Sequence, residues 1–197
     1  VQVIERINRH PGGTGHSRSS CYRGLDGANP VFIKAFDFRY KEIHGNTKDL
    51  EWMLREFNNE AKVLSYCGER QFARTARLLS QGKVQVQGET VHYLVCECAQ
   101  GSVRDLKMLD DKTFSLVERI EIVRDVASAI QELHRHDVAH QDIKPSNVVI
   151  FQNLRLKVTD MGSASCLNLE AAPHDSLPCV GEISYAPYER IYDAEGS

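Results

Sequence analysis

The chain has 197 residues, of which 42% are hydrophobic and 26% are charged, a composition typical of globular domains and not of collagen, coiled-coil arrays or disordered tails. Its 24 basic and 27 acidic residues give a formal net charge of −3, so no general positive field favours binding to nucleic acid or to an anionic membrane. The apolar runs are far too short to span a bilayer, and the N-terminus has neither a signal-peptide pattern nor an initiator methionine. We therefore expect one large domain or two small lobes, in a chain that is a fragment of a longer protein.

The six cysteines show no C-x-x-C pair and no zinc-ligand spacing. Cys96 and Cys98 alternate in an apolar run, so on a strand they share a face. Buried, reduced thiols in a cytoplasmic protein are the preferred interpretation, and a disulfide pair is the alternative. His134, His136 and His140 have no carboxylate or cysteine at zincin spacing, so a site built only to hold a metal is not expected there.

The first half of the chain is predicted to form strands and one helix. Residues 10–24 are rich in glycine and serine and predict a turn between strands, and Asn29-Pro30 predicts a second turn before a β-rich run at 31–36. A helix is predicted from about residue 46 to 67. Strand-like stretches follow at 84–86 and 91–98, separated by residues 87–89. The apolar positions of the helix, at three- and four-residue spacing, are Leu50, Met53, Leu54, Phe57, Ala61 and Leu64.

The second half begins with a helix predicted from about residue 115 to 136. Two short strands are expected at 147–151 and 154–159, and residues 161–197 carry no periodicity, which is typical of a functional loop. The order of elements predicts an α+β fold with two lobes and a cleft between them. The apolar stripe of the helix consists of Leu116, Ile120, Val123, Val126, Ala127, Ile130 and Leu133.

The segment with the clearest chemical content is 140–147, which reads H-Q-D-I-K-P-S-N, and Asp160-Met161-Gly162 follows it after the two short strands. A carboxylate can accept the proton of an attacking hydroxyl, and a lysine can neutralise a transferring phosphoryl group. An amide oxygen and a second carboxylate can hold Mg²⁺. The segment therefore indicates phosphoryl transfer, and a solvated polar hairpin loop is the alternative for the loop alone.

These motifs resemble those of eukaryotic-like (Hanks-type) protein kinases over nearly the whole chain. Residues 140–147 resemble the H-R-D-L-K-P-x-N catalytic loop, and residues 160–162 resemble D-F-G. Residues 31–34 resemble V-A-I-K, and residues 185–189 resemble the A-P-E end of the activation segment. The resemblance implies a bilobal kinase fold with a β-rich N-lobe at 1–99 and an incomplete helical C-lobe at 100–197. The lysine after the aspartate is the serine/threonine form.

The resemblance implies ATP and Mg²⁺ as cofactors, a protein as substrate, and one role for each residue of the catalytic loop. Asp142 is expected to orient or deprotonate the substrate hydroxyl, and Lys144 to contact the γ-phosphoryl group. Asn147 and Asp160 are expected to bind Mg²⁺. Aminoglycoside-type small-molecule kinases are less similar, because they lack an A-P-E-like segment.

The nucleotide-binding residues also follow from the resemblance. Lys34 is expected to hold the α- and β-phosphates and to pair with Glu60, with Glu56 as the alternative partner. Cys96 matches the gatekeeper position at the end of a strand. The remaining predicted contacts to the nucleotide are Gly13 and Gly15 in the glycine loop, the backbones of Glu97 and Ala99, and the apolar Val149 beneath the adenine.

Four departures from the family pattern bear on activity. Phe32 stands where alanine is usual and shares a strand face with Lys34, so it either narrows the adenine pocket or is accommodated by a smaller opposing residue or a displaced strand. Arg18 replaces the third glycine of the loop. Gln141 replaces an arginine that binds phosphate in many relatives, so activity is not expected to need activation-loop phosphorylation. Glu182 replaces a threonine, and its carboxylate could pair with Lys144.

The leading hypothesis is an active serine/threonine kinase, because Lys34, Asp142, Asn147 and Asp160 are all retained. The second hypothesis is a pseudokinase that binds nucleotide or serves as a scaffold, favoured by the substitutions at 18, 32 and 182. A kinase of small metabolites is a third. Because kinases contain further helices after this segment, we expect part of the apolar stripe at 116–133 to be uncovered.

Overall fold

The computed structural model describes residues 1–7, 19–36, 47–105, 114–177 and 180–188, and for residues 47–50 it describes the backbone alone. The predicted glycine-loop residues Gly13 and Gly15, together with Arg18, Cys179 and Glu189, lie outside the described residues. Among the described residues, no helix combines the length and the apolar character needed to cross a membrane. The fold below concerns the described ranges.

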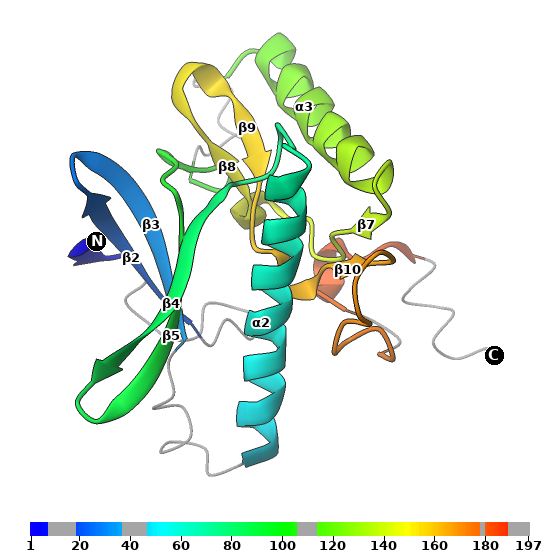
Figure 1. The fold of residues 1–197 in the computed structure, drawn as a ribbon. Helices are drawn as coiled ribbons and strands as arrows, with labels where there is room; N and C mark the ends of the chain where they lie inside the picture. The colour runs from blue at the N-terminus through cyan, green and yellow to red at the C-terminus, as the bar shows by residue number, and fades with distance from the viewer. Residues whose placement is uncertain (8–18, 37–46, 106–113, 178–179, 189–197) are drawn as a thin grey trace.

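The N-terminal part is an antiparallel sheet of five strands in the order β1-β2-β3-β5-β4. In Figure 1 this sheet lies along one side of the long helix α2 (Thr47–Glu69). The predicted β-rich N-terminal part is confirmed. The strands are β1 (Gln2–Arg6), β2 (Ser19–Asp26), β3 (Asn29–Phe36), β4 (Leu78–Val86) and β5 (Glu89–Glu97).

The predicted turn at 10–24 is wrong for residues 19–24, its residues 10–18 lying outside the described ranges, and the predicted turn at Asn29-Pro30 is wrong. Residues 19–24 belong to strand β2, where Gly24 allows β1 to approach so closely that an added Cβ would lie 2.6 Å from the carbonyl oxygen of Gln2. Asn29 and Pro30 belong to β3, and the chain turns at residues 27–28, where Gly27 has φ +61°. Glycine adopts this left-handed conformation without the steric penalty of a side chain, so the turn forms at residues 27–28, immediately before Asn29.

Helix α2 extends to Glu69, two residues past its predicted end. Its buried side chains Met53, Phe57, Ala61 and Leu64 follow the predicted three- and four-residue spacing. The helix contacts β4 and the turn η3 (Met161–Ser163), so one face connects the sheet to the predicted metal-binding segment.

Helix α3 (Leu116–His134) begins with a capping box, in which Ser115 and Glu118 bind each other's backbone amides. Leu133 is fully buried, whereas Leu116, Ile120 and Val123 are 72%, 58% and 65% exposed, so the expectation of a partly uncovered stripe is confirmed. The further elements of this part are β6 (Gly101–Ser102), β7 (Val138–Ala139), η1 (Pro145–Asn147), β8 (Val148–Ile150), η2 (Gln152–Leu154), β9 (Leu156–Val158), β10 (Ser165–Cys166) and η4 (Ile183–Tyr185).

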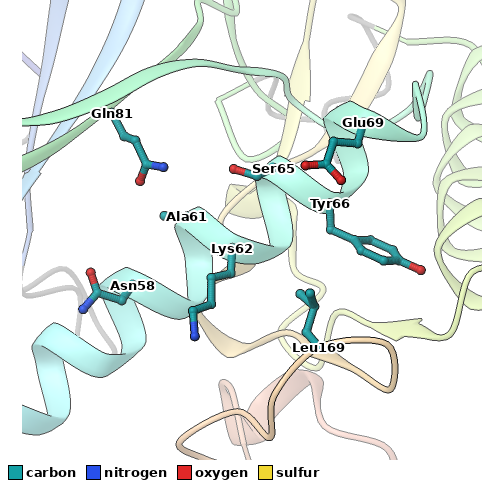
Figure 2. Close-up of a pocket in the computed structure, with 8 residues that line it drawn as sticks. All are labelled: Asn58, Ala61, Lys62, Ser65, Tyr66, Glu69, Gln81 and Leu169. Atoms are coloured by element: carbon teal, nitrogen blue, oxygen red, sulfur yellow. The ribbon is translucent and has the colours of Figure 1, made fainter.

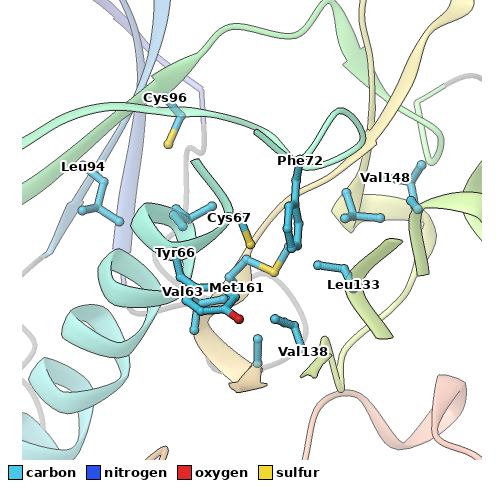
Figure 3. Packing of buried hydrophobic residues seen from close by; sticks show 14 of the residues in the cluster. Val63, Tyr66, Cys67, Phe72, Leu94, Cys96, Leu133, Val138, Val148 and Met161 are labelled. Carbon is cyan, nitrogen blue, oxygen red and sulfur yellow. The ribbon is translucent and has the colours of Figure 1, made fainter. Parts of the chain in front are cut away.

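The two predicted short strands are present as β8 and β9, which form a three-stranded sheet with β6. Strand β10 pairs with β7, and this pairing brings the segment after Asp160 beside the start of the catalytic loop. The largest core cluster includes Met161, which is fully buried, and Figure 3 shows its side chain among Val63, Cys67 and Leu133. The core therefore holds the Asp160 turn in place through the residue next to it.

Candidate active site

The centre of the site is Lys34 on strand β3. Its Nζ lies 2.7 Å from Glu60 Oε2 on helix α2 and 2.7 Å from Asp160 Oδ1, at the start of η3. The predicted pair between Lys34 and Glu60 is present, and Glu60 rather than Glu56 occupies the position. One ammonium thus joins three elements that are far apart in the sequence, and its place on the sheet follows from the alternation of side chains along β3.

The ionisation of this cluster follows from its geometry. Burial acts to lower the pKa of Lys34, but the Asp160 and Glu60 carboxylates outweigh it and raise that pKa well above its usual range. The nearby Lys34 ammonium lowers the pKa of Asp160, whereas burial raises the pKa of Glu60. Lys34 is therefore a permanent cation and Asp160 a carboxylate at neutral pH.

The catalytic-loop residues meet around Asp142. The side-chain amide of Asn147 donates to the Asp142 carbonyl oxygen at 2.9 Å and to Asp142 Oδ2 at 3.1 Å. Lys144 Nζ lies 2.8 Å from the same carboxylate oxygen. Asp142, Lys144 and Asn147 lie close together because their side chains bind one another. The 3₁₀ turn η1, which contains Asn147, leads directly into β8.

His140, the first residue of this loop, is buried, with 3% of its surface exposed, and it binds the backbone on both sides of the site. Its Nε2 lies 3.0 Å from the Thr159 carbonyl oxygen, and its Nδ1 accepts a bond of 3.4 Å from the Asp142 amide. A ring that donates through one nitrogen and accepts through the other is a neutral imidazole. Burial lowers its pKa, which agrees with that state. His140 therefore connects the catalytic loop to the segment before Asp160 without adding a charge.

Glu182 contacts the catalytic loop through both backbone and side chain. Its amide donates to Asp142 Oδ1 at 2.9 Å, and its Oε2 lies 3.4 Å from Lys144 Nζ, as the sequence interpretation anticipated. The preceding Gly181 has φ +82°, and a Cβ there would lie 2.4 Å from the Gln141 carbonyl oxygen. Burial alone would lower the pKa of Lys144, but the Asp142 and Glu182 carboxylates raise it.

The donor set at Asn147 and Asp160 fits a hard divalent cation. Both side chains present oxygens, which are the ligands that Mg²⁺ prefers. Asp160 is ionised and 38% exposed, and because Lys34 engages only Oδ1 in the ion pair, the carboxylate can offer Oδ2 to a cation. Asn147 uses its Nδ2 toward Asp142, and its amide oxygen accepts a bond of 3.3 Å from the Ser146 hydroxyl, so the second lone pair of that oxygen is the one that can bind a cation. The assignment of Mg²⁺ to these residues remains a prediction.

The predicted adenine-binding residues lie at the end of β5 and on β8. The Glu97 side chain pairs with Lys157 on β9 and accepts a bond from the Arg77 amide just before β4, so its carboxylate joins the end of β5 to these two neighbouring segments. Ala99 and Val149 are half-buried. The roles of these three residues in binding adenine remain predictions.

Phe32 is opposite Cys96 in the pairing of β3 with β5. Phe32 is partly buried and packs against the main core cluster, in which Cys96 is 7% exposed. A cysteine side chain is much smaller than a phenyl ring, so the large residue on β3 faces a small one on β5. Of the two interpretations of Phe32, this pairing favours accommodation by a smaller opposing residue.

We expect Phe32→Ala to lower the free energy of unfolding by about 2 kcal/mol, because a packed aromatic ring is lost from a partly buried position. Nucleotide affinity should change by less than about threefold, since the ring rests on the core. Thermal unfolding and nucleotide titration measure the two effects. A tenfold gain in nucleotide affinity would show instead that the ring crowds the adenine position.

Asn59 is a residue of the site that the sequence interpretation missed. It precedes Glu60, is buried, and its amide donates to the Ala164 carbonyl oxygen at 2.8 Å and to that of Gly162 at 3.5 Å. Helix α2 therefore holds the Asp160 turn directly through Asn59 and, by way of Lys34, through Glu60. The only sequence signal was a polar side chain on the buried face of an amphipathic helix, which needs a hydrogen-bond partner.

A separate pocket of about 500 Å³ lies against helix α2, and Figure 2 shows its lining. None of its lining residues is a predicted site residue. They are Asn58, Ala61, Lys62, Ser65, Tyr66 and Glu69 on the helix, Gln81 on β4, and Leu169. The catalytic constellation is therefore defined by side-chain contacts and not by this pocket.

His174, in the segment after β10, is 1% exposed, and neither ring nitrogen has a hydrogen-bond partner among the described residues. Burial lowers its pKa, so the folded chain keeps the ring neutral while the unfolded chain takes up a proton below about pH 6.5. Stability contributed by the neutral ring is therefore lost as the pH falls through that value.

We expect the melting temperature of the protein to fall between pH 7.5 and pH 5, and His174→Leu to reduce this fall, because leucine removes the titrating group. Scanning calorimetry at several pH values measures both. His134→Leu is the control, because His134 is exposed at the end of α3. Equal pH dependence in wild type and His174→Leu would contradict the explanation.

Comparison with known proteins agrees with this geometry. The family model described as "Protein kinase domain" matches residues 17–196. The chain is 33% identical over 150 residues to the "Calmodulin-binding receptor-like cytoplasmic kinase 1" of Arabidopsis thaliana, covering 74% of this chain and 30% of that protein. It is 32% identical over 189 residues to a "Probable serine/threonine-protein kinase PknB" of Lactococcus lactis, covering 96% of this chain and 27% of that protein.

The chain thus spans less than a third of the length of these two relatives. The matched region includes every described residue of the catalytic constellation, from Lys34 to Glu182. The fold agrees as well, with a β-sheet N-terminal part followed, among the described residues, by helix α3 and short strands. The chain therefore belongs to the protein kinase family.

Proposed function

We propose that the protein is an active serine/threonine kinase that transfers the γ-phosphoryl group of ATP to a hydroxyl of a protein substrate. The observation that supports this most is that the two central charged side chains are each held by more than one partner. Lys34 pairs with both Glu60 and Asp160. Asp142 is bound by Asn147, Lys144 and the Glu182 amide. In this proposal residues 1–99 form the N-lobe and residues 100–197 the partial C-lobe.

In the proposed reaction, the Asp142 carboxylate orients the acceptor hydroxyl and takes its proton. The hydroxyl oxygen bonds to the γ-phosphorus of ATP while the bond from that phosphorus to the β,γ-bridging oxygen breaks, and ADP leaves. Its two oxygens are fixed by different groups, Oδ1 by the Glu182 amide and Oδ2 by Asn147 and Lys144. A carboxylate fixed in this way does not need to reorient during proton transfer, which lowers the barrier. Lys144 can neutralise charge on the transferring group because it is already held beside Asp142.

On the nucleotide side, Lys34 supplies a permanent cation for the phosphates, and Glu60 sets its position. Bound Mg²⁺ neutralises phosphate charge, and Asn147 and Asp160 are the residues that we propose to hold it. The Gly13-x-Gly15 loop, the backbones of Glu97 and Ala99, and Val149 complete the proposed ATP site. Each of these assignments follows from the family resemblance.

The alternative is a pseudokinase, which would keep the fold as a nucleotide-binding or scaffolding module. The substitutions Phe32, Arg18 and Glu182 favour it. Retention of Lys34, Asp142, Asn147 and Asp160 favours catalysis, because a binding module has no chemical need for all four. The structure weakens one argument for the alternative, since Phe32 lies opposite the small Cys96.

A phosphotransfer assay distinguishes the two. The full-length protein is incubated with radiolabelled ATP and Mg²⁺ and with peptide pools that carry serine, threonine or tyrosine as acceptor. We expect label on serine or threonine, and none with Lys34→Met. Mg²⁺-dependent nucleotide binding without transfer to any pool would establish the pseudokinase, and transfer to tyrosine alone would overturn the substrate class.

A cytoplasmic location is part of the proposal. The five described cysteines are free thiols, and Cys67, Cys96 and Cys166 are buried. Reduced, buried thiols are typical of proteins in reducing compartments. Fractionation of cells that express the full-length protein tests this location.

A further inference from the structure

A chain of polar contacts joins the catalytic loop to the segment after the Asp160 turn. The Gln141 side-chain amide donates to the Ser165 hydroxyl, and that hydroxyl donates to Asp175 Oδ1. The second oxygen of Asp175 accepts a bond of 2.7 Å from the Ala172 amide. Donors and acceptors match at every step of these contacts, since the Ser165 hydroxyl accepts one hydrogen bond and donates one, and the Asp175 carboxylate only accepts.

These hydrogen bonds begin at Gln141, the residue next to Asp142, so they bear directly on the position of the catalytic loop. Gln141 lies between His140 and Asp142 and has φ +62°, in the left-handed region that residues other than glycine rarely adopt. Ser165 is in β10, which pairs with β7 just before the catalytic loop. The early part of the activation segment is thus attached to Gln141.

The late part of the same segment is attached one residue further on, where the Glu182 amide binds Asp142 and its carboxylate pairs with Lys144. Both ends of residues 165–182 are therefore fixed to adjacent residues of the catalytic loop. The fixed anion at the early end is Asp175, and hydrogen bonds to a charged acceptor are roughly twice as strong as neutral ones. Both attachments are made by side chains and backbone groups of the chain itself.

We propose that Ser165 and Asp175 are positioning residues that, with Gln141, order the activation segment without phosphorylation. The Asp175 carboxylate is the charged acceptor of this set. The Ser165 hydroxyl links Asp175 to the catalytic loop, because it donates to Asp175 and accepts from Gln141. A phosphoryl group placed on Ser165 would face the Asp175 carboxylate and break the chain, so modification there should disorder the segment and not activate it. The inference rests on the proposed function only for its activity readout.

The primary test measures amide hydrogen exchange of residues 165–177 in the full-length protein, which needs no catalysis. Ser165→Ala should increase exchange there about tenfold, because both hydrogen bonds are lost. Ser165→Thr keeps the hydroxyl and should restore wild-type exchange, whereas Ser165→Asp should exceed the alanine variant because two carboxylates then meet. Ser176→Ala is the matched control, since Ser176 is exposed in the same segment.

Asp175→Asn removes the charge and should raise exchange less than Ser165→Ala. Its control is Asp105→Asn, because Asp105 accepts a bond from the Ser102 hydroxyl in the same way but outside this segment. In the active enzyme, Ser165→Ala should lower kcat about tenfold with the KM for ATP within twofold of wild type. Phosphatase treatment of the wild type should change neither exchange nor kcat.

Unchanged exchange in Ser165→Ala, or failure of Ser165→Thr to restore it, would overturn the proposal. A large increase in exchange on phosphatase treatment of the wild type would do the same, because it would show that a phosphate orders the segment. An inactive protein with the expected exchange pattern would contradict the proposed function and would still support the positioning role.

Discussion

Asp142→Asn is expected to lower the rate of phosphoryl transfer by about 10³-fold, because a positioned general base contributes on the order of 10²–10⁴ and this carboxylate also orients the acceptor. Asparagine keeps the shape of the side chain and one oxygen for the Glu182 amide, which donates to Oδ1 at 2.9 Å. Nucleotide affinity should stay within about threefold, since Lys34 and Asp160 are untouched. Steady-state kinetics and nucleotide titration of the full-length protein measure the two quantities.

The control for this variant is Asp137→Asn, which makes the same change in charge at an exposed position before the catalytic loop. Its rate should equal that of the wild type. Loss of nucleotide binding in parallel with loss of transfer in Asp142→Asn would mean that Asp142 acts as a structural residue of the loop. An unchanged transfer rate would remove it from the proposed mechanism altogether.

Asp160→Asn is expected to abolish most of the Mg²⁺-dependent stabilisation by ATP. A ligand present at 100 times its dissociation constant stabilises a folded protein by about 2.7 kcal/mol, and the variant should lose most of this gain. Asparagine removes the negative charge that attracts the cation and weakens the contact of 2.7 Å between Asp160 Oδ1 and Lys34 Nζ. Thermal unfolding with ATP, in the presence of either Mg²⁺ or EDTA, measures the effect.

The melting temperatures with ATP must be compared between Mg²⁺ and EDTA, because only their difference reports on metal binding at Asp160. In the wild type, the melting temperature with ATP should be higher with Mg²⁺ than with EDTA, and in Asp160→Asn the two should be nearly equal. An equal shift under both conditions in the wild type would exclude Asp160 as a metal ligand. Lys34 retains its pair with Glu60 in the variant, so the protein without nucleotide should still fold.

Elements with strong local patterns were predictable from the sequence. Helix α2 has apolar residues at three- and four-residue spacing, and its observed end at Glu69 differs from the predicted one by two residues. Strands β8 and β9 were predicted as well, because two apolar runs are separated by a short turn. Strand β2 was missed, because its glycine and serines give a turn-like composition and its stability comes from pairing with β1 and β3.

The contacts of the site were predictable only where a motif carried them. The pair between Lys34 and Glu60 followed from the family resemblance, and the pair between Lys144 and Glu182 followed from a departure from it. The contact between Asn59 and Ala164 spans 105 positions and has no local pattern. The contact between Gln141 and Ser165 spans 24 positions and depends on the pairing of two-residue strands, which propensity cannot predict.

The burial of Cys96 has a consequence for inhibitor chemistry. Burial raises the pKa of this thiol to about 12, so it is almost entirely protonated near neutral pH. The thiolate is the species that attacks acrylamides and other electrophiles, and Cys96 is the cross-strand partner of Phe32 in the pairing of β3 with β5. An electrophilic ATP analogue should therefore leave Cys96 unmodified and react first at the half-exposed Cys98, two residues along. A covalent probe for this kinase is best designed toward Cys98, with the small Cys96 side chain used only as space for an apolar substituent.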